Sequence, residues 1–72
     1  MLDRRLSVII PTLNERGNIE PLVQRLSRAF EASGIIWEAI FIDDHSTDGT
    51  FQQLERMAKA GFPITPFLKA GK

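Results

Sequence analysis

Residues 35–50 read IIWEAIFIDDHSTDGT and carry the clearest indication of the fold. They open with the apolar run IIWEAIFI, whose β-branched and aromatic side chains are typical of a strand buried within a sheet. Two aspartates and the segment Ser-Thr-Asp-Gly follow, and residues of this kind commonly form the turn and cap that begin a helix. The stretch therefore predicts a buried strand, a polar loop and the start of a helix.

Another strand is predicted on the amino-terminal side, where residues 6–11 read LSVIIP. This short β-branched run has the composition of a strand buried on both faces. Between the two strands we predict a helix that begins near Asn18 and ends at Gly34, because apolar residues recur there on one helical face. These apolar residues are Ile19, Leu22, Val23, Leu26, Ala29 and Phe30.

The alternation of strand and helix continues after the polar loop. Apolar residues at helical spacing from Phe51 to Ala58 predict a second helix, with Asp48 or Ser46 as its N-cap. Residues 63–68 predict a third strand. Strands and helices that alternate at such short spacing are typical of a βαβαβ unit, in which right-handed crossovers produce a parallel sheet. The sequence therefore predicts an α/β fold with a parallel sheet.

Length, charge and composition exclude several classes of function. At 72 residues the chain is one domain at most, and its nine basic residues balance nine acidic ones. This balance argues against binding to nucleic acid, which requires a basic surface. The absence of cysteine excludes disulfide scaffolds and thiol catalysis. No apolar run approaches the roughly 20 residues that span a bilayer, and we expect these residues to be cytoplasmic.

The end of the sequence bears on the domain organisation. The last residues read LKAGK, a polar segment with glycine that directly follows the third predicted strand. An α/β fold is expected to continue at such a point with another helix or loop. We therefore expect residues 1–72 to be the amino-terminal part of a longer domain.

Polar residues follow the first two predicted strands, at the ends where open parallel sheets bind ligands. Asn14 and Glu15 follow the first strand, and Asp43 and Asp44 follow the second. These acceptors, with few fixed cations beside them, suit hydroxyl groups, N–H donors and metal ions better than a bare phosphate. A nucleoside fits, because its ribose hydroxyls and a uracil or guanine imide N–H can donate to carboxylates. Neither G-x-G-x-x-G nor a P-loop motif occurs.

The second polar loop also permits a different function, that of a small EF-hand-like calcium-binding module. With Asp44 at position 1 of the calcium loop, Ser46, Asp48 and Glu55 fall at positions 3, 5 and 12. An EF-hand requires an amphipathic helix directly before position 1, whereas an apolar run with the composition of a strand precedes Asp44. Nucleoside binding and calcium binding are alternatives at this point.

Two motifs resemble a known family. LSVIIPTLNERGNIEPLV at residues 6–23 and FIDDHSTDGT at residues 41–50 resemble the nucleotide-binding region of family 2 glycosyltransferases, especially the dolichol-phosphate mannosyltransferase-like branch. The resemblance implies that the chain is the βαβαβ half of a Rossmann-like A-type glycosyltransferase domain. It also implies that the longer protein binds a nucleotide diphosphate sugar, a GDP- or UDP-sugar, and transfers the sugar to a polyprenyl phosphate.

The resemblance also implies roles for individual residues. It places around the nucleoside the residues Pro11, Leu13, Glu15, Ile42 and Asp44. Asp43 would support the second loop, and Asn14 would hold the turn after the first strand. The family often has tyrosine at the position of Leu13, so an aromatic surface for the base is missing here. It often has glycine at the position of His45, and histidine tolerates a positive φ better than most residues.

Cofactor and catalysis are also implied by the resemblance. The family uses a divalent cation, Mg²⁺ or Mn²⁺, whose Asp-x-Asp ligands follow a later strand. Its catalytic base lies later still, and its longer members often carry membrane segments. We therefore predict no catalytic residue and no metal ligand in these 72 residues, and we expect the chain alone to be inactive.

Overall fold

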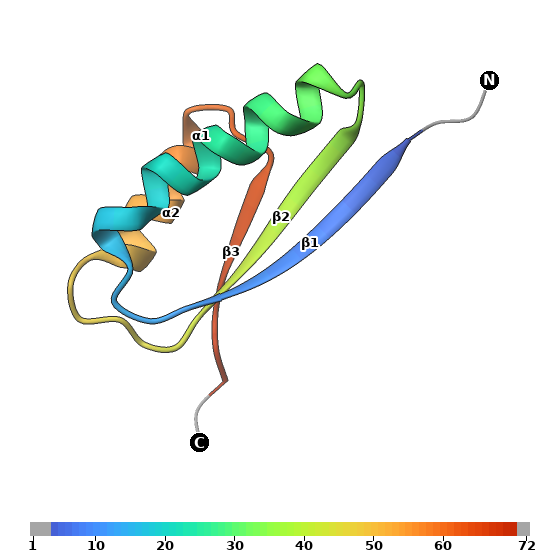
Figure 1. Ribbon diagram of the computed structural model, residues 1–72. Coiled ribbons are helices and arrows are strands. Elements are labelled where there is room, and N and C mark those ends of the chain that lie inside the picture. Colours follow the sequence, from blue (N-terminus) through green and yellow to red (C-terminus); the bar gives the residue numbers. More distant parts are fainter. Residues whose placement is uncertain (1–3, 71–72) are drawn as a thin grey trace.

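The computed structural model describes residues 4–70, in which three strands and two helices alternate. The elements are β1 (Arg5–Thr12), α1 (Arg16–Ala32), β2 (Ile36–Asp43), α2 (Thr50–Lys59) and β3 (Ile64–Leu68). The strands form one parallel sheet in the order β1-β2-β3 (Figure 1). The predicted α/β class and the parallel βαβαβ unit, half of a Rossmann-like domain, are confirmed.

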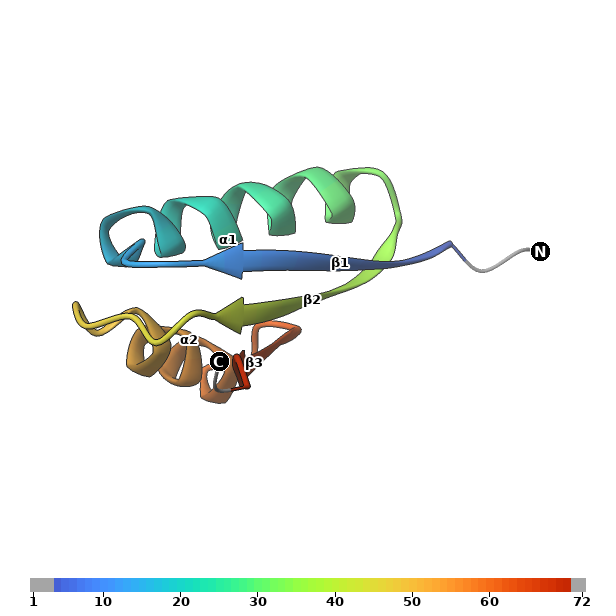
Figure 2. The ribbon, with the colours of Figure 1, turned by 90° about the horizontal axis from the view of Figure 1, so that it is seen from below.

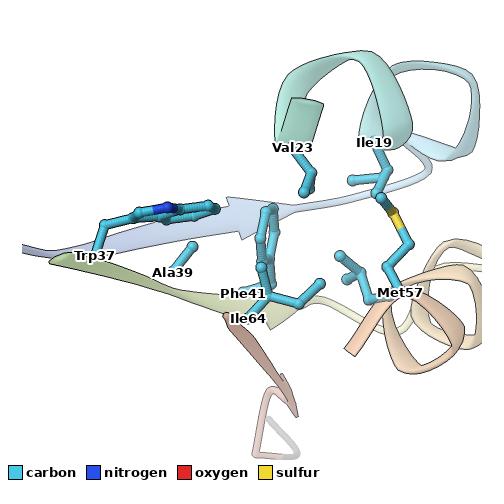
Figure 3. Packing of buried hydrophobic residues seen from close by; sticks show 8 residues of the cluster. Ile19, Val23, Trp37, Ala39, Phe41, Met57 and Ile64 are labelled. Atoms are coloured by element: carbon cyan, nitrogen blue, oxygen red, sulfur yellow. The ribbon is translucent and has the colours of Figure 1, made fainter. Parts of the chain in front are cut away.

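Both helices pack on the same face of the sheet (Figure 1). The two crossovers lead to neighbouring strands in the same direction, and right-handed crossovers then place α1 and α2 on one side. Trp37, Ala39 and Phe41 of β2 point to this side and are buried. Figure 3 shows Phe41 at the centre of the core, with Val23 of α1 and Met57 of α2 around it.

The opposite face of the sheet is open over residues 4–70. Ile9 of β1, Ile36 of β2 and Phe67 of β3 lie on this face, with exposed fractions of 66%, 57% and 54%. The prediction that the first strand is buried on both faces is therefore wrong for this part of the chain, and β2 is buried only toward the helices. The physical reason is the strand order, because right-handed crossovers in the order β1-β2-β3 leave one face uncovered.

The two helices begin differently from the predictions. α1 begins two residues before the predicted start, since the carbonyl of Glu15 accepts the N–H of Asn18 at 2.8 Å. The side chain of Asn18 donates to Glu15 Oε1 at 3.0 Å and does not cap the helix. At α2 the N-cap is Gly49, so the prediction of Asp48 or Ser46 at that position is wrong. Asp48, one residue earlier, still accepts the N–H of Thr50 through Oδ1 at 3.0 Å.

The LKAGK segment lies only partly within the described residues, because Gly71 and Lys72 are outside them. Lys69 and Ala70 follow β3 without regular secondary structure. Between residues 4 and 70, neither helix has the length and apolar character needed to cross a membrane.

Candidate functional site

Two polar loops meet at the carboxyl end of the sheet. The loop after β1 covers residues 13–15, and the loop after β2 covers residues 44–49. Figure 2 shows both loops at the same end of the molecule, next to the amino-terminal ends of the helices. Thr12 pairs with Asp43, and Asp43 pairs with Leu68, so the three strands end level with one another. This edge is where open parallel sheets commonly bind ligands.

Asn14 joins the first loop to the second. Its N–H donates to Ser46 Oγ at 2.8 Å, and its side-chain Oδ1 accepts the N–H of Thr47 at 2.9 Å. Asn14 is thus bound through both its main chain and its side chain, which fixes the spacing between the loops. The family resemblance implies only a turn-holding role for Asn14, and the structure adds this contact across the site.

Two further hydrogen bonds tie the start of α1 to the start of α2. The N–H of Glu15 donates to Thr50 Oγ1 at 3.0 Å, and the N–H of Arg16 donates to Asp48 Oδ2 at 3.2 Å. The hydroxyl of Thr50, which is buried, also donates to Asp48. This hydroxyl is the main reason that the pKa of Asp48 lies below its ordinary value, with burial acting in the opposite direction. Asp48 therefore bridges both helix starts as a carboxylate.

Asp43 lies beneath both loops and has no exposed surface. Its Oδ1 accepts the hydroxyls of Thr12 at 2.8 Å and Ser46 at 2.6 Å, and its Oδ2 accepts the N–H of Ser46 at 2.8 Å. Burial is the largest influence on the pKa of Asp43 and acts to raise it, but the donors from Ser46 and Thr12 together lower the pKa below its ordinary value. Asp43 is a buried carboxylate that holds the two loops from below.

Two residues of these loops other than glycine have a left-handed main chain. The φ angles of Asn14 and His45 are 51° and 56°, and asparagine and histidine adopt this conformation more readily than most residues. His45 Nε2 lies 3.0 Å from the carbonyl oxygen of Lys69, so this ring nitrogen donates when it carries a proton. The bond connects the loop after β2 with the end of β3.

An open cavity of about 600 Å³ lies at the carboxyl ends of β1 and β2. Cavities of about 300–1,000 Å³ commonly bind small molecules. The lining brings together five predicted site residues: Pro11, Leu13, Glu15, Ile42 and Asp44. The sixth, Asp43, is buried and does not line the cavity. The cavity therefore offers two carboxylates from different loops beside apolar side chains.

The sequence profile of glycosyl transferase family 2 matches residues 7–71, nearly the whole chain. The chain belongs to glycosyl transferase family 2. The resemblance inferred from the two motifs is confirmed, and the matched residues include both loops and the complete lining of the cavity.

Individual relatives of this family 2 chain are similar over the same region. A dolichol-phosphate mannosyltransferase of Pyrococcus furiosus is 39% identical over 60 residues, which make up 83% of the chain and 16% of that protein. An undecaprenyl-phosphate 4-deoxy-4-formamido-L-arabinose transferase of Salmonella paratyphi B is 39% identical over 57 residues, 79% of the chain and 16% of that protein. The chain thus spans a small part of the length of the curated relatives it matches.

Two residues that line the cavity, Thr12 and Lys69, are absent from the predicted set. Lys69 directly follows β3, and the rule that places ligands at the carboxyl ends of strands applies to this strand as well. The sequence signal for Lys69 was therefore present. Thr12 is 5% exposed and its hydroxyl is bound to Asp43, so its small contribution to the wall depends on side-chain orientation that the sequence does not reveal.

The second loop of this family 2 chain does not have the geometry of an EF-hand. The residues directly before Asp44 form β2 rather than a helix. Ser46 and Asp48 are also occupied, because Ser46 donates to Asp43 and Asp48 accepts N–H groups of the helix starts. In the part of the chain that the structure describes, no three histidine, cysteine, aspartate or glutamate side chains are grouped to hold a metal ion.

We expect the chain to show no calcium binding in the micromolar range. Calcium requires six to eight oxygen ligands, whereas the side-chain oxygens of Ser46 and Asp48 are already bound to protein groups. Isothermal titration calorimetry with calcium chloride measures this directly. Micromolar binding that disappears in Glu55→Gln would contradict the expectation and restore the EF-hand interpretation.

Proposed function

We propose that the cavity binds the nucleoside of a nucleotide diphosphate sugar. The observation that carries this proposal is the pair of carboxylates, Glu15 and Asp44, which line one cavity from two different loops. Hydrogen bonds between the loops fix the distance between these residues before any ligand arrives. Such preorganisation favours binding because less conformational entropy is lost when the ligand is bound.

A nucleoside has the donors that match these carboxylates. Glu15 Oε1 accepts the side-chain N–H of Asn18 at 3.0 Å, which orients the carboxylate and leaves acceptor capacity for ribose hydroxyls or a base. Asp44 is exposed and suits the imide N–H of uracil or guanine. Each sheltered hydrogen bond to a carboxylate contributes about 1.5–3 kcal/mol. Leu13 and Ile42 offer apolar contact to the base without an aromatic ring.

For the longer protein we propose transfer of the sugar to a polyprenyl phosphate at a membrane. The names of the two relatives, which refer to dolichol phosphate and undecaprenyl phosphate, support this class of acceptor. In the transfer, a phosphate oxygen of the acceptor forms a bond to the anomeric carbon, and the bond from that carbon to the nucleotide diphosphate breaks. A divalent cation, Mg²⁺ or Mn²⁺, would neutralise charge on the diphosphate. The residues described above would hold the nucleoside.

Titration of the 72-residue chain with UDP and with GDP, followed by ¹H–¹⁵N NMR, tests the proposed site. We expect one of the two nucleotides to shift the amide signals of Glu15 and Asp44. Asp44→Ala should weaken binding by about 10- to 100-fold, because a hydrogen bond to a charged group is lost. Glu55→Ala, which removes an exposed carboxylate from α2, is the matched control and should leave the affinity unchanged.

The proposal fails if neither nucleotide shifts these signals in a chain whose amide spectrum is that of a folded protein. It also fails if Asp44→Ala and Glu55→Ala reduce the affinity equally, since the effect would then reflect net charge rather than contact. Comparison of UDP with GDP in the same titration identifies the preferred base.

A further inference from the structure

Lys69 brings a positive charge to a cavity whose other walls are acidic, apolar or neutral. It directly follows β3 and lines the cavity together with Glu15 and Asp44. Its N–H donates to the carbonyl of Asp43 at 2.8 Å, and its own carbonyl lies 3.0 Å from Nε2 of His45. These contacts hold the main chain of Lys69 against the second loop, while its side chain is exposed.

The ammonium group of Lys69 is available to a ligand. Lys69 is the one basic residue among those that line this cavity between residues 4 and 70. Among residues 4–70, the side chain of Lys69 has no hydrogen-bond or ion-pair partner. An ammonium has three N–H donors and no acceptor, so it matches an anion, and lysine commonly binds phosphate as a point charge. The cavity thus has acceptors on the first two loops and a cationic donor on the third.

We propose that Lys69 binds the diphosphate of the nucleotide while Glu15 and Asp44 bind its nucleoside. The inference rests on the proposed function, because it requires one ligand that carries both a nucleoside and phosphates. Two carboxylates alone would repel a diphosphate, and a cation in the same cavity offsets this repulsion. The first two loops were expected to suit hydroxyl groups better than a bare phosphate, and Lys69 would extend the site to phosphate.

The experiment compares a nucleoside with its diphosphate on the whole 72-residue chain by NMR titration, using uridine and UDP or guanosine and GDP. Lys69→Met keeps the apolar stem of the side chain and removes the charge. Lys59→Met removes an exposed charge from the last turn of α2 and is the matched control. Because the phosphate of a prenyl acceptor has the same chemistry, a short water-soluble prenyl monophosphate is titrated in parallel.

We expect Lys69→Met to weaken binding of the diphosphate by about tenfold and to leave binding of the nucleoside unchanged, because only the phosphate contact is lost. Lys69→Arg should retain most of the affinity, and Lys59→Met all of it. Equal affinity of Lys69→Met and the unmodified chain for the diphosphate would overturn the inference while the proposed function stands. An effect of Lys69→Met on the prenyl monophosphate alone would overturn it too. If neither the nucleoside nor its diphosphate binds the unmodified chain, the proposed function itself is wrong.

Discussion

Replacement of Phe41 by alanine is expected to leave most of the chain unfolded in the absence of denaturant. Phe41 has no exposed surface, and it lies in the centre of the core between β2 and both helices (Figure 3). Truncation of a buried phenylalanine to alanine costs about 3–5 kcal/mol. A single core in a domain below about 80 residues rarely supplies more than that amount. Urea unfolding followed by far-ultraviolet circular dichroism measures the loss.

The matched control is Phe67→Ala on the other side of the sheet. Phe67 is the same residue type in the neighbouring strand, but 54% of its surface is exposed and it points away from the helices. We expect this change to cost less than about 1 kcal/mol, because little apolar surface is lost from the core. Phe41→Leu, which keeps most of the buried volume, should give a folded chain with a measurable intermediate loss. Equal losses for Phe41→Ala and Phe67→Ala would show that the helix-covered face is not the core.

The positions of the five elements could be predicted from the sequence because each element carries its own periodicity. The apolar run of β2 and the helical spacing from Ile19 to Phe30 are local patterns, and they place the elements within two residues. The exposure of Ile9 could not be predicted, because it depends on strand order and on the side to which the crossovers turn. That information lies in contacts between distant segments rather than in local composition.

Of the candidate site, the carboxylates could be predicted from the sequence, but the hydrogen bonds that join the two loops could not. Open parallel sheets bind ligands at the carboxyl ends of their strands, and this rule together with the family resemblance indicates Glu15 and Asp44. The structure brings both residues to one cavity. The hydrogen bonds of Asn14 with Ser46 and Thr47 were not predictable, since they join residues 32 and 33 positions apart in the sequence. From the sequence alone these residues have the composition of ordinary turns and caps. The role of Asn14, Ser46 and Thr47 in joining the loops is visible only when β1 and β2 are paired in the sheet.

Replacement of Asp43 by alanine is expected to destabilise the chain by about 3 kcal/mol at neutral pH. The change leaves the hydroxyls of Thr12 and Ser46 and the N–H of Ser46 without their shared acceptor. Asp44→Ala is the matched control, because the adjacent carboxylate is exposed and accepts none of these bonds. It should lower nucleotide affinity with little effect on unfolding. A loss of stability in Asp43→Ala no larger than that in Asp44→Ala would contradict the role of Asp43 as the support of both loops.

The pH dependence of the free energy of unfolding measures the stabilisation by the Asp43 carboxylate independently. The pKa of Asp43 is lower in the folded chain than its ordinary value of about 3.9 in an unfolded chain. The stabilisation it provides is therefore complete above that ordinary value and is lost as the pH falls through the lower, folded pKa. Urea unfolding at neutral pH and at a series of acidic pH values should show this decline in the unmodified chain. In Asp43→Ala the decline should be shallower but not absent, because Asp48 also has a lowered pKa and titrates in the same direction. An equally steep decline in both chains would assign the acid sensitivity to other carboxylates.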